Sequence, residues 1–383
     1  MKTSIIKNRI IILFLIVAFS SCKDSNTNAN TVEDETLVFQ SVLDSIYSEN
    51  KNAIGLMVHI ESPKKEISWS GVAGFSDKNN SKLHVNQPAL IASNTKTYVS
   101  VAILRLVELG KLDLNQTIEN LISKETNDLL MSDGYHTSQI KVVQLLNHTS
   151  GIHDYATTDE YMQMVKDNPK HRYTRDEQIQ LAMKLGEPLG QPGEMFSYAD
   201  VNYLLLTEII ESYTGQPFYT SIRELINYDK LGMQTTWFST LEEYPKNALP
   251  LAHQYWKSEG MDSYNVDHSF DLYGGGGLAS STKDLAVFCQ SLFNNKIFDN
   301  DKTLDLIYTK ANPIEPMDGA YCLGISPKTI NGIQGFGHGG FWGTTVNYFP
   351  KLDTSIAIFV LNRDKRILRL DLNQALIKAL LEL

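Results

Sequence analysis

A serine and a lysine three residues apart open a stretch with helical spacing. Apolar residues at the period of a helix follow Ser93 and Lys96, and Gly110 marks the end of that helix. Residues three apart lie on one face of a helix, so the two side chains point the same way. A nearby amine can help to remove the proton of a serine hydroxyl and so make it a nucleophile. The pattern indicates acyl transfer, although Ser-x-x-Lys alone is more often a solvated helix start.

A second stretch with chemical potential follows a Pro-Gly turn. The helix expected to begin near Val201 places Tyr198 and Asp200 on a loop at its entrance, where functional groups are common. A lysine ammonium beside a tyrosine favours the phenolate, which can act as a general base. The alternative, that the tyrosine only packs its ring, stays open.

A third stretch lies near the C-terminus and reads His338-Gly339-Gly340 on an expected strand. Glycines in a strand let another backbone, such as that of a substrate, approach closely. A bulge or a barrel corner is the alternative interpretation of the glycine pair.

Together these stretches resemble a known family. The resemblance rests on three motifs in this order: Ser93-x-x-Lys96, Tyr198-x-Asp200 and His338-Gly339-Gly340. They are similar to those of the serine β-lactamase and penicillin-binding-protein superfamily. Its class C branch also includes D,D-peptidases, D-aminopeptidases and esterases. The resemblance extends from about residue 37 to the C-terminus and implies a β-lactamase/transpeptidase-like fold.

The resemblance implies a role for each motif residue. Ser93 would form the acyl-enzyme, while Lys96 and Tyr198 would exchange its proton and later activate water. His338 would orient Tyr198 or the substrate. The backbone N–H groups of Ser93 and Phe341 would form the oxyanion hole. The other residues expected to line the substrate site are Asp200, Gly339 and Gly340.

Two positions depart from the family pattern. Asp200 stands where asparagine is usual, and its carboxylate should keep Lys96 charged, which shifts the proton transfer to Tyr198. Gly339 and Phe341 supply none of the hydroxyl groups that hold a substrate carboxylate in the lactamase and carboxypeptidase branches. Because a buried carboxylate without donors is costly, we expect weak penicillinase and carboxypeptidase activity.

The N-terminus has the pattern of an export signal. Basic residues precede an apolar run over 10–19, which is too short to span a membrane, and Ser20, Ser21 and Cys22 follow. The cysteine after small residues resembles a bacterial lipoprotein signal. We therefore predict a signal peptide over 1–21, lipidation of Cys22, a flexible tether over 22–36, and anchoring to a cell-envelope membrane. An ordinary signal with a chance cysteine is the alternative.

The remaining chain, 37–383, predicts a single hydrolase domain of mixed α and β structure. Helical spacing covers 37–47 and 368–383, and helical patterns dominate a lobe over about 111–268. Alternating or apolar runs predict strands at 54–60, 67–75, 334–340, 344–349 and 355–361. The simplest fold is an antiparallel sheet built from both chain ends, flanked by helices, with an inserted all-helical lobe. The segment 145–152 is expected to be a hydrogen-bonded turn.

Composition and motifs exclude several other functions. The chain has 383 residues and a net charge of −10, with no basic cluster beyond its start, which argues against nucleic acid. The cysteines lack metal-ligand spacing, and no metal or cofactor motif is found. The Gly-x-Gly-x-x-Gly spelling at 335–340 is followed by no helix, so a dinucleotide site is rejected.

We expect a lipid-anchored serine hydrolase that cleaves an ester, amide or peptide bond in a small molecule or peptide. A silent module that binds peptidoglycan fragments or lactams is the alternative. The substrate and the oligomeric state stay open.

Overall fold

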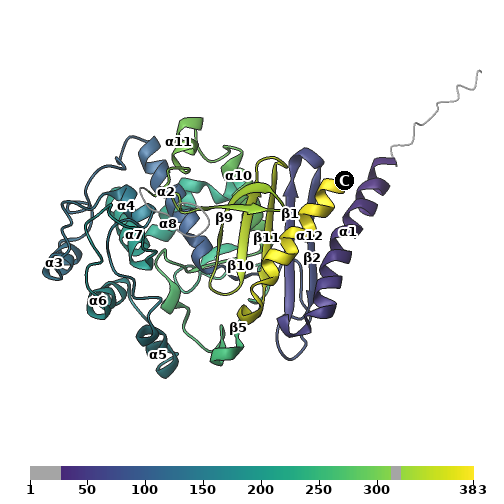
Figure 1. The fold of residues 1–383 in the computed structure, drawn as a ribbon, viewed down its shortest axis with the longest axis horizontal. Coiled ribbons are helices and arrows are strands. Elements are labelled where there is room, and N and C mark those ends of the chain that lie inside the picture. Colours follow the sequence, from purple (N-terminus) through teal and green to yellow (C-terminus); the bar gives the residue numbers. More distant parts are fainter. Residues whose placement is uncertain (1–26, 312–320) are drawn as a thin grey trace, which may run out of the picture.

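The computed structural model describes residues 27–311 and 321–383, and its centre is a six-stranded antiparallel sheet (Figure 1). The strand order is β2-β1-β11-β10-β9-β8. The strands are β1 (Gly55–Ser62), β2 (Ile67–Gly74), β8 (Ser326–Ile330), β9 (Ile333–Gly339), β10 (Thr344–Phe349) and β11 (Thr354–Val360). The predicted mixed fold, with a sheet shared by both ends of the chain, is confirmed.

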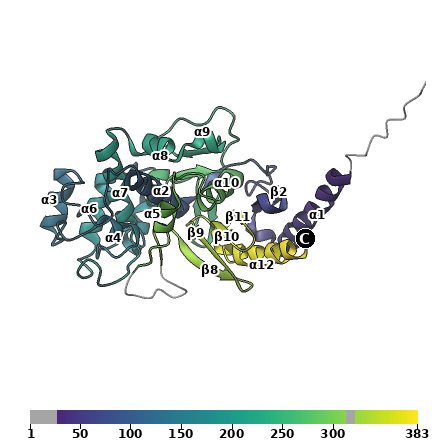
Figure 2. The same ribbon diagram turned by 90° about the horizontal axis from the view of Figure 1, so that it is seen from above.

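Helices cover both faces of this sheet (Figures 1 and 2). On one face lie α1 (Thr27–Glu49) and α12 (Leu368–Glu382), and on the other lies α10 (Thr282–Phe293). Successive residues of β11 alternate between the two cores, with Ile356 and Ile358 in one and Ala357 and Phe359 in the other. Because both faces are buried, the strand is apolar throughout rather than alternating.

A mainly helical lobe lies beside the sheet (Figure 1). Helix α2 (Thr95–Glu108) leads into the lobe, and α11 (Asp301–Leu306) follows it. The helices of the lobe itself are α3 (Lys124–Ser132), α4 (Val142–Leu146), α5 (Asp159–Asp167), α6 (Arg175–Leu185), α7 (Asp200–Thr214), α8 (Phe218–Ile226) and α9 (Tyr228–Leu231). Short strands also occur: β3 (Ala89–Leu90), β4 (Thr236–Phe238), β5 (Tyr255–Trp256), β6 (Met261–Asp262) and β7 (Leu278–Ser280). The expectation of an all-helical lobe is therefore wrong. Strands of two or three residues are too short to show a period in the sequence.

Helix α1 begins at Thr27 rather than at residue 37, so part of the predicted tether is helical. The sequence over 27–36 has no glycine or proline, and each residue added to an existing helix gains a hydrogen bond. The predicted signal peptide and Cys22 lie outside the described residues. Within 27–311 and 321–383, no helix has both the length and the apolar character needed to cross a bilayer.

Candidate active site

Ser93 lies in a tight turn directly before α2. A short 3₁₀ helix over Ala92–Asn94 precedes α2, and the Ser93 side chain is half-buried. Ala92 has a φ of 47°, in the left-handed region that residues other than glycine avoid. Such strain is kept where the surrounding packing enforces it, and Ala92 is buried. The turn therefore fixes the serine at the start of the helix.

Lys96 is held by oxygen acceptors on three sides. Its Nζ donates to Ser93 Oγ at 3.3 Å, to Asp200 Oδ1 at 2.6 Å and to Gly275 O at 2.5 Å. Burial alone would lower the pKa of Lys96, but the negative charge of Asp200 outweighs it and raises that pKa well above its ordinary value. Lys96 is therefore an ammonium, as expected from the departure at Asp200.

Tyr198 lies on the loop before α7, and its ring centroid is 4.8 Å from Lys96 Nζ. Burial raises the pKa of Tyr198 well above its ordinary value, while Lys96 and a hydrogen bond from Ser93 lower it by less. Lys96 thus favours the phenolate, as expected, but burial outweighs this effect in the resting site. Tyr198 is within reach of Ser93 but keeps its proton.

The segment 145–152 is the predicted hydrogen-bonded turn, and it also supports Tyr198. Ser150 Oγ accepts from Ile152 N–H at 3.1 Å. His148, which is fully buried, accepts at Nδ1 from Ala199 N–H at 3.1 Å, and its ring centroid lies 4.2 Å from that of Tyr198. His148 thus packs against the tyrosine loop, a contact between distant segments that no local pattern signals.

His338 is a neutral side chain joined to a tyrosine that the sequence did not single out. Burial, and then Lys96, lower the pKa of His338 to about 3. Its Nδ1–H donates to Gly339 O at 2.8 Å, because a carbonyl can only accept, so Nε2 accepts from the Tyr321 hydroxyl at 2.9 Å. The ring centroids of His338 and Tyr198 are 6.3 Å apart. His338 therefore holds Tyr321 rather than Tyr198.

The two glycines after His338 face different sides of β9. A Cβ on Gly340 would lie 2.3 Å from Ile91 O, so only glycine lets the strand end approach the loop before Ser93. A Cβ on Gly339 would instead point toward Arg369 on the α12 side of the sheet. Gly340 thus lies next to the nucleophile turn, while the open side of Gly339 faces away from it.

A cavity of ≈ 100 Å³ opens at Ser93. Its walls include Ser93, Tyr198, Asp200, Asp271 and Phe341, so four of the eight predicted site residues meet there. Asp271 was not predicted, although it precedes the glycine run 274–277 by only a few residues. A Cβ on Gly276 would lie 2.2 Å from Asp271 Oδ1, so that run makes room for the carboxyl group.

Asp271 and Asp154 add negative charge around Asp200. Asp154 Oδ1 accepts from Asp200 N–H at 2.8 Å. Burial, and then the charge of Asp200, raise the pKa of Asp154 to about 6 and that of Asp271 to about 7. Among the described residues, the Asp271 carboxyl group has no hydrogen-bond donor. The cavity therefore holds an unpaired acidic group beside the candidate nucleophile.

The comparison with protein families agrees with this arrangement. The family model described as Beta-lactamase matches residues 43–381. The chain belongs to this family. It is a serine hydrolase of the β-lactamase family, as the resemblance implied. A relative from Salmonella agona, provisionally named D-alanyl-D-alanine carboxypeptidase, is 27% identical over 305 residues, which are 70% of this chain and 68% of the relative.

Solved structures share the fold at lower identity. A D-amino acid amidase from Ochrobactrum anthropi SV3 gives a TM-score of 0.73 at 23% identity and covers 91% of this chain and 98% of its own. A D-stereospecific amidohydrolase from Streptomyces gives 0.72 at 22% identity, over 87% and 97%. A penicillin-binding-protein homologue from Pyrococcus abyssi gives 0.68 at 22% identity, over 87% and 73%.

Proposed function

We propose that this chain hydrolyses amides or peptides whose acyl part carries a protonated amino group, through an acyl-enzyme on Ser93. The unpaired Asp271 carboxyl group in the cavity carries the proposal, because a substrate ammonium is its natural partner. The structural neighbours named as an amidase for D-amino acids and as a D-stereospecific amidohydrolase support amide chemistry and the D configuration.

In the proposed reaction, Ser93 Oγ attacks the carbonyl carbon as its proton passes to Tyr198. Tyr198 must first lose its own proton to solvent, and the negative charge of Asp200 opposes this. A substrate ammonium on Asp271 adds positive charge near that site and so lowers the pKa of Tyr198. Tyr198 then gives the proton to the leaving nitrogen as the C–N bond breaks. Tyr198 later takes a proton from the water that attacks the ester carbonyl carbon. It returns this proton to Ser93 Oγ as the bond between the acyl carbon and Oγ breaks, which releases the carboxylic acid.

Lys96 and the backbone would stabilise the charges of this reaction. The Lys96 ammonium lies 3.3 Å from Ser93 Oγ and over the Tyr198 ring, where it stabilises negative charge on either oxygen. The N–H groups of Ser93 and Phe341 are the proposed oxyanion hole, and both residues line the cavity. A preorganised donor pair of this kind acts only as charge develops on the carbonyl oxygen.

Amide hydrolysis is favoured over carboxypeptidase action by the charge of the cavity. A carboxypeptidase must bind the terminal carboxylate of its substrate, which needs a cation or several donors. Here the walls offer Asp200 and Asp271, and Lys96 already donates to Asp200 and Gly275. In this proposal, the chain resembles the relatives named D-alanyl-D-alanine carboxypeptidase in the type of reaction more than in the substrate.

The test compares D-phenylalanine amide with its N-acetyl derivative at equal concentrations. Asp271→Asn should raise KM for the free amine roughly 10–100-fold, the effect of losing a charged hydrogen bond, and leave the acetylated amide nearly unchanged. Because only the ionised carboxylate pairs with the amine, KM of the unmodified enzyme should rise as pH falls through about 7. Asp305→Asn, on an exposed helix, is the control. Equal turnover of both amides by every variant would refute the proposed specificity.

We also propose that the enzyme is exported and held at a bacterial cell-envelope membrane by lipid on Cys22. The support is the sequence pattern alone: a basic start, a short apolar run and two serines before the cysteine. Anchoring would place the hydrolase where peptides and amides of the envelope are found.

A further inference from the structure

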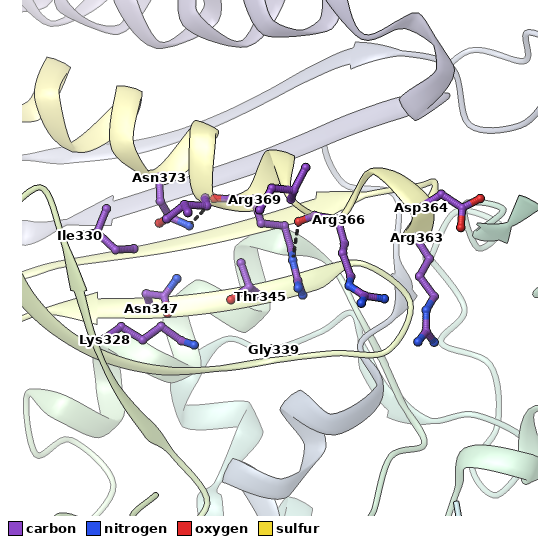
Figure 3. Close-up of a pocket in the computed structure, with 12 residues that line it drawn as sticks. Lys328, Ile330, Gly339, Thr345, Asn347, Arg363, Asp364, Arg366, Arg369 and Asn373 are labelled. Carbon is purple, nitrogen blue, oxygen red and sulfur yellow. Dashed lines mark hydrogen bonds between the residues drawn. The ribbon is translucent and has the colours of Figure 1, made fainter. Parts of the chain in front are cut away.

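A second and larger hollow lies on the side of β9 that faces away from Ser93. It has a volume of ≈ 600 Å³ and lies between β9, β10 and the start of α12 (Figure 3). Gly339, with no side chain, and the short Thr345 and Asn347 form its floor. Because the residues on this face of the sheet are small, a space remains between them and α12.

Basic side chains dominate the walls of this hollow. They are Lys328, Arg363, Arg366 and Arg369. The acidic wall residue, Asp364, accepts from Ser258 N–H at 2.8 Å and from its hydroxyl at 2.7 Å, and it points away from the three guanidinium groups (Figure 3). The whole chain carries a net charge of −10, so this concentration of positive charge runs against the rest of the molecule.

Two of the arginines lack acceptors for their N–H groups. Within the described residues, the exposed Arg366 side chain has no hydrogen bond or ion pair. Arg363 is fixed between the rings of Trp256 and Phe341, 3.9 and 3.7 Å from their centroids, and its buried Nε and Nη1 have no partner. Arg363 also lines the hollow, and a guanidinium group fixed by ring stacking is preorganised to bind an anion there.

Arg369 has a different, structural role. It donates to Thr344 O at 2.6 Å and to Arg366 O at 3.0 Å, which ties α12 to β10. Burial, and then the charge of Arg366, lower the pKa of Arg369 to about 10. The arginines thus repel one another, and an anion bound in the hollow would relieve that repulsion.

The rim of the hollow is apolar. Ile367 and Leu370, at the start of α12, are 63% and 42% exposed. The positive end of the dipole of this helix also lies at the hollow, because Ile367 and Leu370 belong to its first turn. Large exposed apolar residues beside cations suit a ligand that has both an anionic group and a hydrocarbon part.

We propose that this hollow binds an organic phosphate, with the phosphate on Arg363 and Arg366 and the organic part on Ile367 and Leu370. Guanidinium groups match the paired oxygens of a phosphate, and the volume exceeds the needs of the bare anion. A soluble phosphate ester and the head group of a membrane phospholipid share this chemistry.

Calorimetric titration and vesicle flotation test the site and separate the two sources. The titrants are glycerol 3-phosphate and inorganic phosphate, and the vesicles are phosphatidylcholine with and without phosphatidylglycerol. Arg366→Gln should weaken binding roughly tenfold or more, and Arg366→Lys should weaken it less. Lys378→Gln, an equal loss of charge on the exposed side of α12, is the control and should change little.

Each outcome bears on the proposal. Binding of glycerol 3-phosphate, weakened in Arg366→Gln only, supports a soluble ligand. Binding only to vesicles that contain phosphatidylglycerol, with the same dependence on Arg366, supports a lipid head group. Binding in no arm, or an equal loss in Lys378→Gln, would overturn the proposal. These measurements need no turnover, so they stand apart from the proposed amide hydrolysis.

Discussion

The protonation of two residues, Lys96 and Tyr198, decides what the nucleophile can do. In the resting site, Lys96 is charged because of Asp200, and Tyr198 keeps its proton because burial outweighs the neighbouring ammonium. Because both groups are protonated, neither can act as a general base in the resting site. In the proposed reaction, the base forms when a cationic substrate binds.

Tyr198→Phe tests the proton acceptor directly. The change keeps the ring and its packing against His148 but removes the hydroxyl. We expect folding to survive and acylation, followed by stopped-flow kinetics, to slow on the order of 10²–10⁴-fold. Asp200→Asn, which restores the residue usual in the family, should be much milder. Nearly full turnover in Tyr198→Phe together with inactivity in Asp200→Asn would reverse these roles.

Sequence patterns found the residues of the site that lie within short motifs. Ser93 and Lys96 are one helical turn apart, so their contact is local and could be predicted. Asp271 and Tyr321 reach the site only through the fold, from a loop and from a segment far along the chain. No spacing in the sequence could place an unpaired carboxyl group in the cavity.

At the scale of elements, the site depends on how the end of β9 meets the start of α2. Asn94 Nδ2 donates to Thr344 Oγ1 at 2.9 Å, and Thr344 Oγ1 donates to Ile91 O at 3.0 Å. These bonds join the nucleophile turn to β10. Gly340 lies between them, where a side chain would not fit.

Gly340→Ala should disturb this junction. The new Cβ would lie 2.3 Å from both Ile91 O and Thr344 Oγ1, so the loop must move. A displacement of this kind can cost about 10²-fold in turnover. Gly339→Ala is the matched control, because its Cβ would have the end of the Arg369 side chain as its nearest neighbour at 3.3 Å and would meet no backbone atom closer than 3.8 Å. Steady-state kinetics and melting temperatures should show a large loss in the first variant alone; equal behaviour would contradict the role of the junction.

Long periodic elements could be predicted, while short or irregular ones could not. The β1–β2 hairpin, β9, β10, β11 and α12 have apolar runs or clear periods. Strand β8 contains Pro327, which is tolerated because β8 is the edge of the sheet. The position of β8 in the sheet is set by its pairing with β9, so it could not be predicted from the sequence of β8 alone.

The whole molecule uses the two faces of one sheet for different purposes. The cavity at Ser93 opens on the side of the helical lobe, and the basic hollow lies on the side of α12 (Figure 3). Arg363 contacts both regions, since it lines the hollow and stacks on Phe341, which lines the cavity. A ligand in the hollow therefore has a physical connection to the active site.

The location of the whole protein depends on its N-terminus. Cys22→Ala removes the thiol that the proposed lipid would occupy. In the native host, the unmodified protein should partition into the detergent phase of a Triton X-114 separation, and the variant should move to the aqueous phase or be mis-sorted. Equal partitioning of both proteins into detergent would contradict lipidation of Cys22.

The central claim is that Ser93 becomes acylated, and intact-protein mass spectrometry after a fluorophosphonate tests it most directly. The unmodified enzyme should gain the mass of one adduct, and Ser93→Ala should gain none while melting as the unmodified protein does. Peptide mapping should place the adduct on Ser93. An adduct that persists in Ser93→Ala would show that the nucleophile lies elsewhere.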